Sequence, residues 1–406
     1  MATFRDLDMG EVSRNKKRTM WKGIFMKRRR RMNELAMAAA VAMMVSGFNM
    51  GAMAAEALAA EQISISECVE KVTAVTYVGD DGEMTESYVV TVDDAAAIEG
   101  LTKDQITAVM EQTNRETKEV TEVPVEIKDI LVDGATLTIK LTSPVSSNAV
   151  VNVNAGEKYD LTFTSETAER ENFSIADFQA LSFMGSNGTE ILYRMRSGSG
   201  EKQPLVLWMH GSGECGTDNR IHITANRGAT AFAEYTDDAY VIAAQYPESY
   251  HTPFEEGEEK IMEDWLAAYT ELIQSLIEEG KVDADRVYLT GASMGGGLVL
   301  RYMTDYPELF ARVVAMCSRG TINEDLSVLE AVADKPIWLF HAESDFVNPS
   351  VNSKEVYEKL VELGNKDAKL TIFSDEDLEK LGVGFSHAIW APVLNDMEMM
   401  EWLFEA

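Results

Sequence analysis

The feature that most constrains the fold is the pentapeptide Gly291-Ala292-Ser293-Met294-Gly295. It follows residues 286–290, which are predicted to be a buried strand, and it precedes residues 296–306, which are predicted to be a helix. Glycine two positions to either side of Ser293 removes the Cβ atoms that would clash in a very tight turn. Strand, pentapeptide and helix together predict a nucleophile elbow, in which the serine hydroxyl stands exposed at the edge of a sheet.

The first 60 residues differ in composition from the rest of the chain. They contain 11 Lys or Arg against 5 Asp or Glu, including the run Lys27-Arg28-Arg29-Arg30-Arg31, and an apolar segment follows at 35–45. Small residues then alternate, as in Ala52-Met53-Ala54. These features are typical of a secretory signal peptide, and the apolar run is short for a membrane span. We therefore expect residues 1–60 to be a signal peptide, with a retained membrane anchor as the alternative.

The rest of the chain is strongly acidic and long enough for two domains. The whole sequence has 36 Lys or Arg and 68 Asp or Glu, so removing residues 1–60 leaves 25 basic and 63 acidic residues and a net charge of −38. Because phosphate groups are bound mainly through Lys and Arg, this charge disfavours nucleic acids and anionic membranes as partners. We expect an exported protein without stable membrane insertion.

Residues 61–168 show the pattern of a small all-β domain. Residues 102–112 are an exception, because a capping box at Thr102 and Gln105 predicts a helix there. The domain contains no histidine, so we expect a spacer or packing role, with carbohydrate or partner binding as the alternative. Short segments that recur about every ten residues, separated by Asp-Gly turns, predict the strands of a sandwich; they lie at 72–78, 87–92, 123–132, 135–141 and 159–164.

From residue 169 to 406, strand-like and helix-like segments alternate. Continuous apolar runs at 204–209 and 240–245 predict buried strands, and apolar residues recur at helical spacing over 258–279. Eight strands with interleaved helices, the elbow strand among them, predict a mainly parallel sheet with helices on both faces. This is the α/β-hydrolase architecture.

Three cysteines, Cys68, Cys215 and Cys317, are too few for a disulfide framework. Their odd number leaves at least one thiol unpaired within the chain. Cys215 and Cys317 both fall where a predicted strand meets a loop, so they could pair. Two unpaired thiols are the favoured interpretation.

A serine nucleophile needs a base within hydrogen-bond reach and a third group that orients the base. In this architecture the three follow in the order serine, acid, histidine. Of the five histidines, only His387 comes late enough to follow an acid that itself follows Ser293. His387 lies in a loop between the last predicted strand and the last predicted helix, and it is the predicted base.

The acid is expected in the loop after the strand predicted at 337–340. Asp345 and Glu343 both qualify by type and position. We favour Asp345, because it begins a turn containing Pro349, where its carboxylate can fold back towards the imidazole; Glu343 is the alternative. The carboxylate should stay ionised, since it fixes the histidine tautomer and stabilises the imidazolium.

The oxyanion of an acyl-transfer intermediate needs hydrogen-bond donors. The backbone N–H of Met294, directly after the serine, is one expected donor. The second is expected from the loop that His210 opens, where glycine and serine let the main chain come close. Either Ser212 or Gly213 could supply it, and His210 itself is expected to be structural.

Four motifs in this order resemble the secreted esterase branch of the α/β-hydrolases that includes polyhydroxybutyrate-depolymerase-like and feruloyl-esterase-like enzymes. The resemblance covers about residues 175–406 and implies ester hydrolysis without metal or organic cofactor, with Ser293, Asp345 and His387 as the triad. The preceding domain is similar to the immunoglobulin-like N-terminal domain attached to some of these esterases. The motifs are residues 210–214 with Asp218-Asn219, the elbow at 291–296, His341-x-x-x-Asp345 and His387-x-x-Trp390.

Two further residues are candidates for substrate contact. Trp390, three positions beyond the predicted base, could line an acyl or aromatic pocket or pack under the last helix. Arg319, in a predicted loop, could meet a substrate carboxylate or be only solvated. No metal site is predicted, because the histidines do not cluster with carboxylates at ligand spacing.

The favoured function is a secreted serine esterase that acts through an acyl-serine intermediate on a small-molecule or polysaccharide ester. Acetyl or feruloyl groups on plant polysaccharide and short-chain polyesters are the expected substrates. A serine peptidase of the prolyl-oligopeptidase type is the alternative, although no β-propeller repeat precedes the catalytic segment. A binding protein with an inactive hydrolase domain is the third hypothesis.

Overall fold

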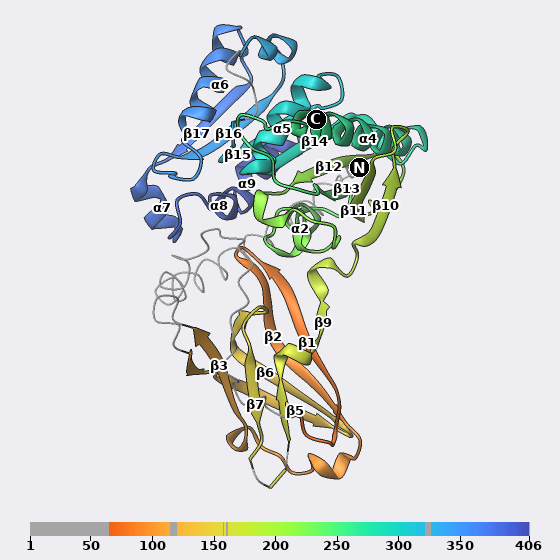
Figure 1. The fold of residues 1–406 in the computed structure, drawn as a ribbon, viewed down its shortest axis with the longest axis vertical. Helices are drawn as coiled ribbons and strands as arrows, with labels where there is room; N and C mark the ends of the chain where they lie inside the picture. The colour runs from red at the N-terminus through yellow and green to blue at the C-terminus, as the bar shows by residue number, and fades with distance from the viewer. Residues whose placement is uncertain (1–64, 114–119, 157, 160, 321–325, 406) are drawn as a thin grey trace, which may run out of the picture.

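The structure is a computed structural model that describes residues 65–113, 120–156, 158–159, 161–320 and 326–405. The predicted signal peptide lies outside these residues. A β region and an α/β region follow one another along the chain and lie end to end (Figure 1). Within the described part, no helix has both the length and the apolar character that crossing a membrane requires.

The described strands of the β region form two sheets. The strand order is β5-β6-β2-β1-β9 in one sheet and β4-β3-β7-β8 in the other. Tyr88 and Ile139 of the first sheet and Phe163 of the second are buried in one apolar cluster, and the rings of Tyr88 and Phe163 lie 5.7 Å apart. Each sheet therefore buries one face against the other, as the period of two along a strand allows. The bounds are β1 Val69–Gly79, β2 Gly82–Val92, β3 Thr107–Thr113, β4 Val120–Pro124, β5 Ile127–Asp133, β6 Thr136–Ser146, β7 Val151–Asn154, β8 Thr162–Thr164 and β9 Glu169–Asn172.

The helix expected over residues 102–112 is wrong. The capping box exists, and Gln105 Oε1 accepts a hydrogen bond from the backbone N–H of Thr102 at 2.9 Å. It begins only one 3₁₀ turn over Lys103–Gln105, and β3 follows and pairs with β4 and β7. Sheet pairing within the β region outweighs the local helical signal.

Two expected boundaries also differ from the structure. The strand expected over 123–132 is divided into β4 and β5, which belong to different sheets. The first sheet continues past residue 168, because β9 pairs in parallel with β1 and places Glu169 opposite Thr73. The immunoglobulin-like assignment of this region stays a prediction.

An eight-stranded sheet forms the centre of the α/β region. Its order is β10-β11-β13-β12-β14-β15-β16-β17, so the predicted number of strands is present. The pairs β10/β11 and β11/β13 are antiparallel, and the other neighbours are parallel. The bounds are β10 Gln179–Met184, β11 Glu190–Arg196, β12 Gln203–Met209, β13 Tyr240–Gln245, β14 Val282–Ala292, β15 Arg312–Met316, β16 Ile337–Ala342 and β17 Ala368–Phe373.

Helices cover both faces of this sheet. Leu205 and Leu207 of β12 are buried in one cluster with α4, α5 and α6, whereas Val206 and Trp208 are buried in another with α2, α3, α7, α8 and α9. The last helical segment is divided into α8 and α9, because the Asp396 side chain caps α9. The bounds are α2 Ile221–Thr224, α3 Thr230–Tyr235, α4 Glu258–Glu278, α5 Met294–Asp305, α6 Val351–Glu362, α7 Asp375–Leu381, α8 Trp390–Leu394 and α9 Met397–Phe404.

The β1–β2 hairpin contacts the α/β region close to α2 (Figure 1). Glu83 of β2 accepts hydrogen bonds from Arg220 Nη2 at 2.7 and 3.0 Å. Asp80, in the hairpin turn, accepts one from Arg227 Nη1 at 3.2 Å. Val78 is buried in the same apolar cluster as α2 and α3. Ion pairs and an apolar contact therefore join the hairpin to the segment that follows β12.

Candidate active site

Ser293 lies at the carboxyl end of β14 and directly precedes α5. Its φ of 60° and ψ of −120° fall in a region that L-residues rarely adopt. A Cβ on Gly295 would lie 2.0 Å from the carbonyl oxygen of Met209, and a Cβ on Gly291 would lie 2.7 Å from that of Gly295. The close approach of β12 and α5 therefore requires both glycines of the pentapeptide.

The structure brings the three predicted triad residues together. His387 Nε2 lies 2.9 Å from Ser293 Oγ, and His387 Nδ1 lies 2.7 Å from Asp345 Oδ2. The carboxylate accepts a hydrogen bond from the N–H at Nδ1, which leaves Nε2 as the acceptor that faces the serine hydroxyl. Such a chain can move a proton from the serine to the imidazole.

Asp345, and not the exposed Glu343, contacts the imidazole. Its Oδ1 accepts hydrogen bonds from the backbone N–H groups of Val347 and Asn348 at 2.9 and 3.0 Å. Burial acts to raise the pKa of Asp345, but hydrogen bonds from His341 and His387, and the charge of His387, outweigh it and hold the pKa well below its usual range. The carboxylate is therefore ionised at neutral pH.

His341 supports Asp345 from behind, a contact that the sequence interpretation missed. This buried side chain places Nε2 3.0 Å from the carbonyl oxygen of Asn348 and 3.3 Å from Asp345 Oδ2, and Nδ1 2.8 Å from Ser353 Oγ. Two acceptors at Nε2 assign the proton to that nitrogen, so Nδ1 accepts from the serine. The spacing His-x-x-x-Asp after a buried strand was the available signal.

The loop after β12 reaches the other side of Ser293. Ser212 lines the same pocket as Ser293, whereas Gly213 is not among the lining residues. Met294 opens α5, so its backbone N–H belongs to the first helical turn, where no carbonyl of the preceding turn accepts it. Cys215 and Cys317 are free thiols, so the disulfide that the sequence left open is not formed.

Two polar side chains, the buried His210 and the half-buried Glu214, fix the backbone of this loop. Glu214 Oε2 accepts from the N–H of Gly211 at 2.7 Å, and Oε1 accepts from Asn226 Nδ2 at 3.0 Å. His210 Nε2 accepts from the N–H of Tyr246 at 2.8 Å, so Nδ1 donates to the carbonyl of Gly211 at the same distance. Burial raises the pKa of Glu214 to about 7 and lowers that of His210 to about 4. His210 thus holds the loop through its neutral form.

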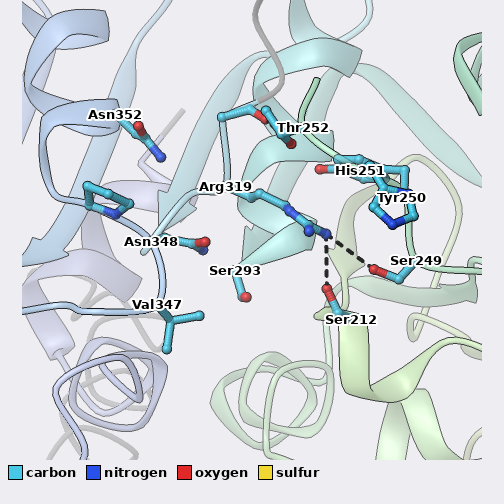
Figure 2. A pocket seen from close by; sticks show the side chains of 12 residues that line it. Ser212, Ser249, Tyr250, His251, Thr252, Ser293, Arg319, Val347, Asn348 and Asn352 are labelled. Carbon is cyan, nitrogen blue, oxygen red and sulfur yellow. Dashed lines mark hydrogen bonds between the residues drawn. The ribbon is translucent and has the colours of Figure 1, made fainter. Parts of the chain in front are cut away.

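A pocket of about 520 Å³ opens beside Ser293 (Figure 2). This volume is within the range of small-molecule sites. Loops that follow β12, β13, β15 and β16 form its wall, and most of the lining groups are polar. The lining residues are Ser212, Ser249, Tyr250, His251, Thr252, Ser293, Arg319, Gly320, Val347, Asn348, Pro349 and Asn352.

The two predicted substrate residues occupy different places. Arg319 lines the pocket and extends towards Ser212 and Ser249 (Figure 2). Trp390 is not among the lining residues; its ring lies edge-on to the imidazole of His387, with 5.7 Å between centroids, and packs against the core under α8 and α9. Trp390 is therefore placed to hold the base, and Arg319 to meet a ligand.

Comparisons with known proteins agree with this geometry. Residues 193–389 match the model of a family described as phospholipase/carboxylesterase. A solved structure described as a thermostable esterase is 29% identical, with a TM-score of 0.66, and the match covers 83% of this chain and 99% of that chain. "Putative esterase NocK" from Nocardia uniformis subsp. tsuyamanensis is 23% identical over 46% of this chain and 54% of its own length, so this chain spans about half of that curated relative.

The fold, the turn at Ser293 and the similarity to known proteins all support the same assignment. The parallel sheet places Ser293, Asp345 and His387 at the carboxyl ends of its strands or in the loops beyond them, where the α/β-hydrolase fold carries its reacting groups. The α/β region of this chain has the α/β-hydrolase fold, and its similarity to carboxylesterases supports a hydrolase that acts on esters.

Proposed function

We propose that this protein is a serine esterase that hydrolyses carboxylic esters through an acyl-serine intermediate. Ser293 Oγ attacks the ester carbonyl while His387 Nε2 takes the hydroxyl proton across the 2.9 Å contact. The resulting imidazolium is stabilised by the ionised carboxylate of Asp345, 2.7 Å from Nδ1. His387 is therefore the general base that activates the serine.

The negative oxygen of the tetrahedral intermediate needs donors already in place. The N–H of Met294 supplies one, and the loop at 211–213 supplies the other, each worth about 10²–10³ in kcat in related chemistry. Collapse of the intermediate breaks the ester C–O bond, and His387 returns its proton to the departing alcohol. A water molecule then attacks the acyl-serine by the same steps and releases the acid.

The observation that carries the proposal is the unbroken hydrogen-bonded chain from Ser293 Oγ through His387 to Asp345. Export behind a cleaved leader and action on carbohydrate acyl or feruloyl esters, or on short-chain polyesters, belong to the same proposal. They rest on the sequence patterns, and a pocket of about 520 Å³ has room for groups of this size.

Turnover of two substrate classes tests the proposal. The protein should hydrolyse 4-nitrophenyl acetate rapidly and a proline 4-nitroanilide slowly or not at all, and a fluorophosphonate should label it at Ser293. Ser293→Ala should abolish both the labelling and the turnover. Faster cleavage of the anilide would favour the peptidase alternative, and absence of both labelling and turnover would favour an inactive hydrolase domain.

A further inference from the structure

Arg319 places a positive charge in the pocket beside the nucleophile. Its backbone N–H donates to the carbonyl of Ser293 at 2.9 Å, so the two residues are held next to each other. The guanidinium extends across the pocket towards the loops that carry Ser212 and Ser249 (Figure 2). A ligand that reaches Ser293 through this pocket therefore passes the guanidinium.

The guanidinium contacts neutral groups. Nη1 lies 3.2 Å from Ser249 Oγ and 3.5 Å from Ser212 Oγ, and Cζ lies 5.3 Å from the ring centroid of Tyr250. Within the described residues, no carboxylate lies at ion-pair distance from Arg319. Arg196, Arg227 and Arg301, by contrast, each pair with a carboxylate. The chain has 68 acidic residues, yet none of those that the structure describes pairs with this arginine, so the guanidinium is suited to an anion from outside.

The backbone around Arg319 is fixed by three side chains, two from other loops and one from the first turn of α6. Asn348 Nδ2 donates to the carbonyl of Cys317 at 2.8 Å, Asn352 Nδ2 to that of Ser318 at 3.2 Å, and Thr252 Oγ1 to that of Gly320 at 2.8 Å. Cys317 has a φ of 41°, which this packing holds. Because this backbone is already ordered, no loop has to be ordered when the side chain of Arg319 binds a ligand.

We propose that Arg319 binds a carboxylate on the substrate, so that the preferred esters carry a carboxylate close to the scissile bond. A guanidinium presents paired N–H donors that match the two oxygens of a carboxylate. The bonds to Ser212 and Ser249 both use Nη1, so no side chain in the described part of the chain occupies Nη2 or Nε, the two donors of this fork. The proposal rests on the proposed esterase function and names its substrate class.

Two pairs of matched esters test the proposal, with the carboxylate on either side of the ester. For the acyl side, the 4-nitrophenyl monoester of adipic acid is compared with the same ester bearing a terminal carboxamide. For the alcohol side, 4-acetoxybenzoate is compared with 4-acetoxybenzamide. Replacing carboxylate by carboxamide keeps size and shape and removes the charge. We expect kcat/KM to favour the carboxylate by about 10-fold or more in one pair, the size of effect typical of a charge-assisted hydrogen bond.

Arg319→Met should lower kcat/KM more for the carboxylate ester than for the matched carboxamide ester, and so bring that ratio close to 1. Arg286→Met is the control, because Arg286 pairs with Asp283 near the opposite end of β14 and should leave the ratio unchanged. A ratio that survives Arg319→Met, or an equal loss on both esters, would overturn the proposal.

The wild-type protein alone also decides the question. If it hydrolyses the neutral esters but shows no preference for a carboxylate in either pair, the inference fails while the esterase function stands. If it hydrolyses none of the four esters and resists fluorophosphonate, the proposed function itself fails.

Discussion

The two sides of the pocket are held by different parts of the molecule. Ser293, Asp345 and His387 all come from the α/β region, at or beyond the ends of its parallel strands. The loop that carries Ser212 leads into α2, and there Arg220 binds Glu83 of the β region. We therefore expect the triad to depend on the α/β region alone, and the wall that carries Ser212 to depend on the β region as well.

Glu83 makes the main contact between the β region and the segment that carries Ser212 and leads into α2. Its carboxylate is buried and accepts hydrogen bonds from Thr76 Oγ1 and Asn172 Nδ2, each at 2.8 Å, in addition to those from Arg220. Burial acts to raise the pKa of Glu83, but the bonds from Asn172 and Thr76 and the charge of Arg220 outweigh it and lower the pKa. Removing one partner of such a buried pair leaves an uncompensated charge.

The largest effect is expected within the triad. Asp345→Asn should lower kcat for 4-nitrophenyl acetate by about 10⁴-fold, because an amide cannot hold the His387 tautomer that accepts the serine proton. Glu343→Gln is the matched control from the same loop and should retain wild-type kcat, since Glu343 is exposed. A larger loss of kcat in Glu343→Gln than in Asp345→Asn would show that Glu343, and not Asp345, is the acid of the triad.

The stability of Asp345→Asn relative to wild type should depend on pH. The ordinary pKa of an aspartate, 3.8, is lowered in the folded protein, so ionised Asp345 stabilises the fold above about pH 5. This contribution is lost progressively as the pH falls below about 4 towards the lower folded pKa. The difference in unfolding free energy between wild type and Asp345→Asn, measured by urea titration, should therefore be smaller at pH 3.5 than at pH 6. A difference that does not change with pH would contradict the lowered pKa.

Glu83→Gln tests the wall that depends on the β region. We expect a loss of about 1–3 kcal/mol in unfolding free energy. We also expect a measurable fall in kcat, of up to about tenfold, because the substitution disturbs one of the two oxyanion donors. Glu86→Gln, an exposed glutamate on the same strand, should change neither quantity. If Glu83→Gln lowered stability and left kcat unchanged, the β region would be a packing partner only.

The smallest effect is expected at the tip of the hairpin. Asp80→Asn removes one carboxylate from Arg227, which keeps its contacts with Glu234 and Asn395, each at 2.6 Å. We expect a loss of about 0.5–1 kcal/mol in thermal or urea unfolding and no measurable change in kcat. If Asp80→Asn lost more unfolding free energy than Glu83→Gln, the main contact between the two regions would be at the β1–β2 turn.

The parts predicted from sequence are those set by local pattern. Ser293 was predicted from its flanking glycines, His387 from chain order, and Asp345 from its place in the turn after a predicted strand. The strand at 107–113 was missed because its pairing partners lie elsewhere in the chain. The contact between Glu83 and Arg220 joins residues 137 positions apart, and no spacing rule reveals it.

The most direct test of the account is to trap the acyl group. The protein is mixed with 4-nitrophenyl acetate, quenched in acid within the first turnover and digested, and the acetylated peptide is located by mass spectrometry. We expect an acetyl group on Ser293 in the wild type and none at any position in Ser293→Ala. The variant should also show no initial burst of 4-nitrophenol. Acetyl at another residue, with turnover retained in Ser293→Ala, would contradict it.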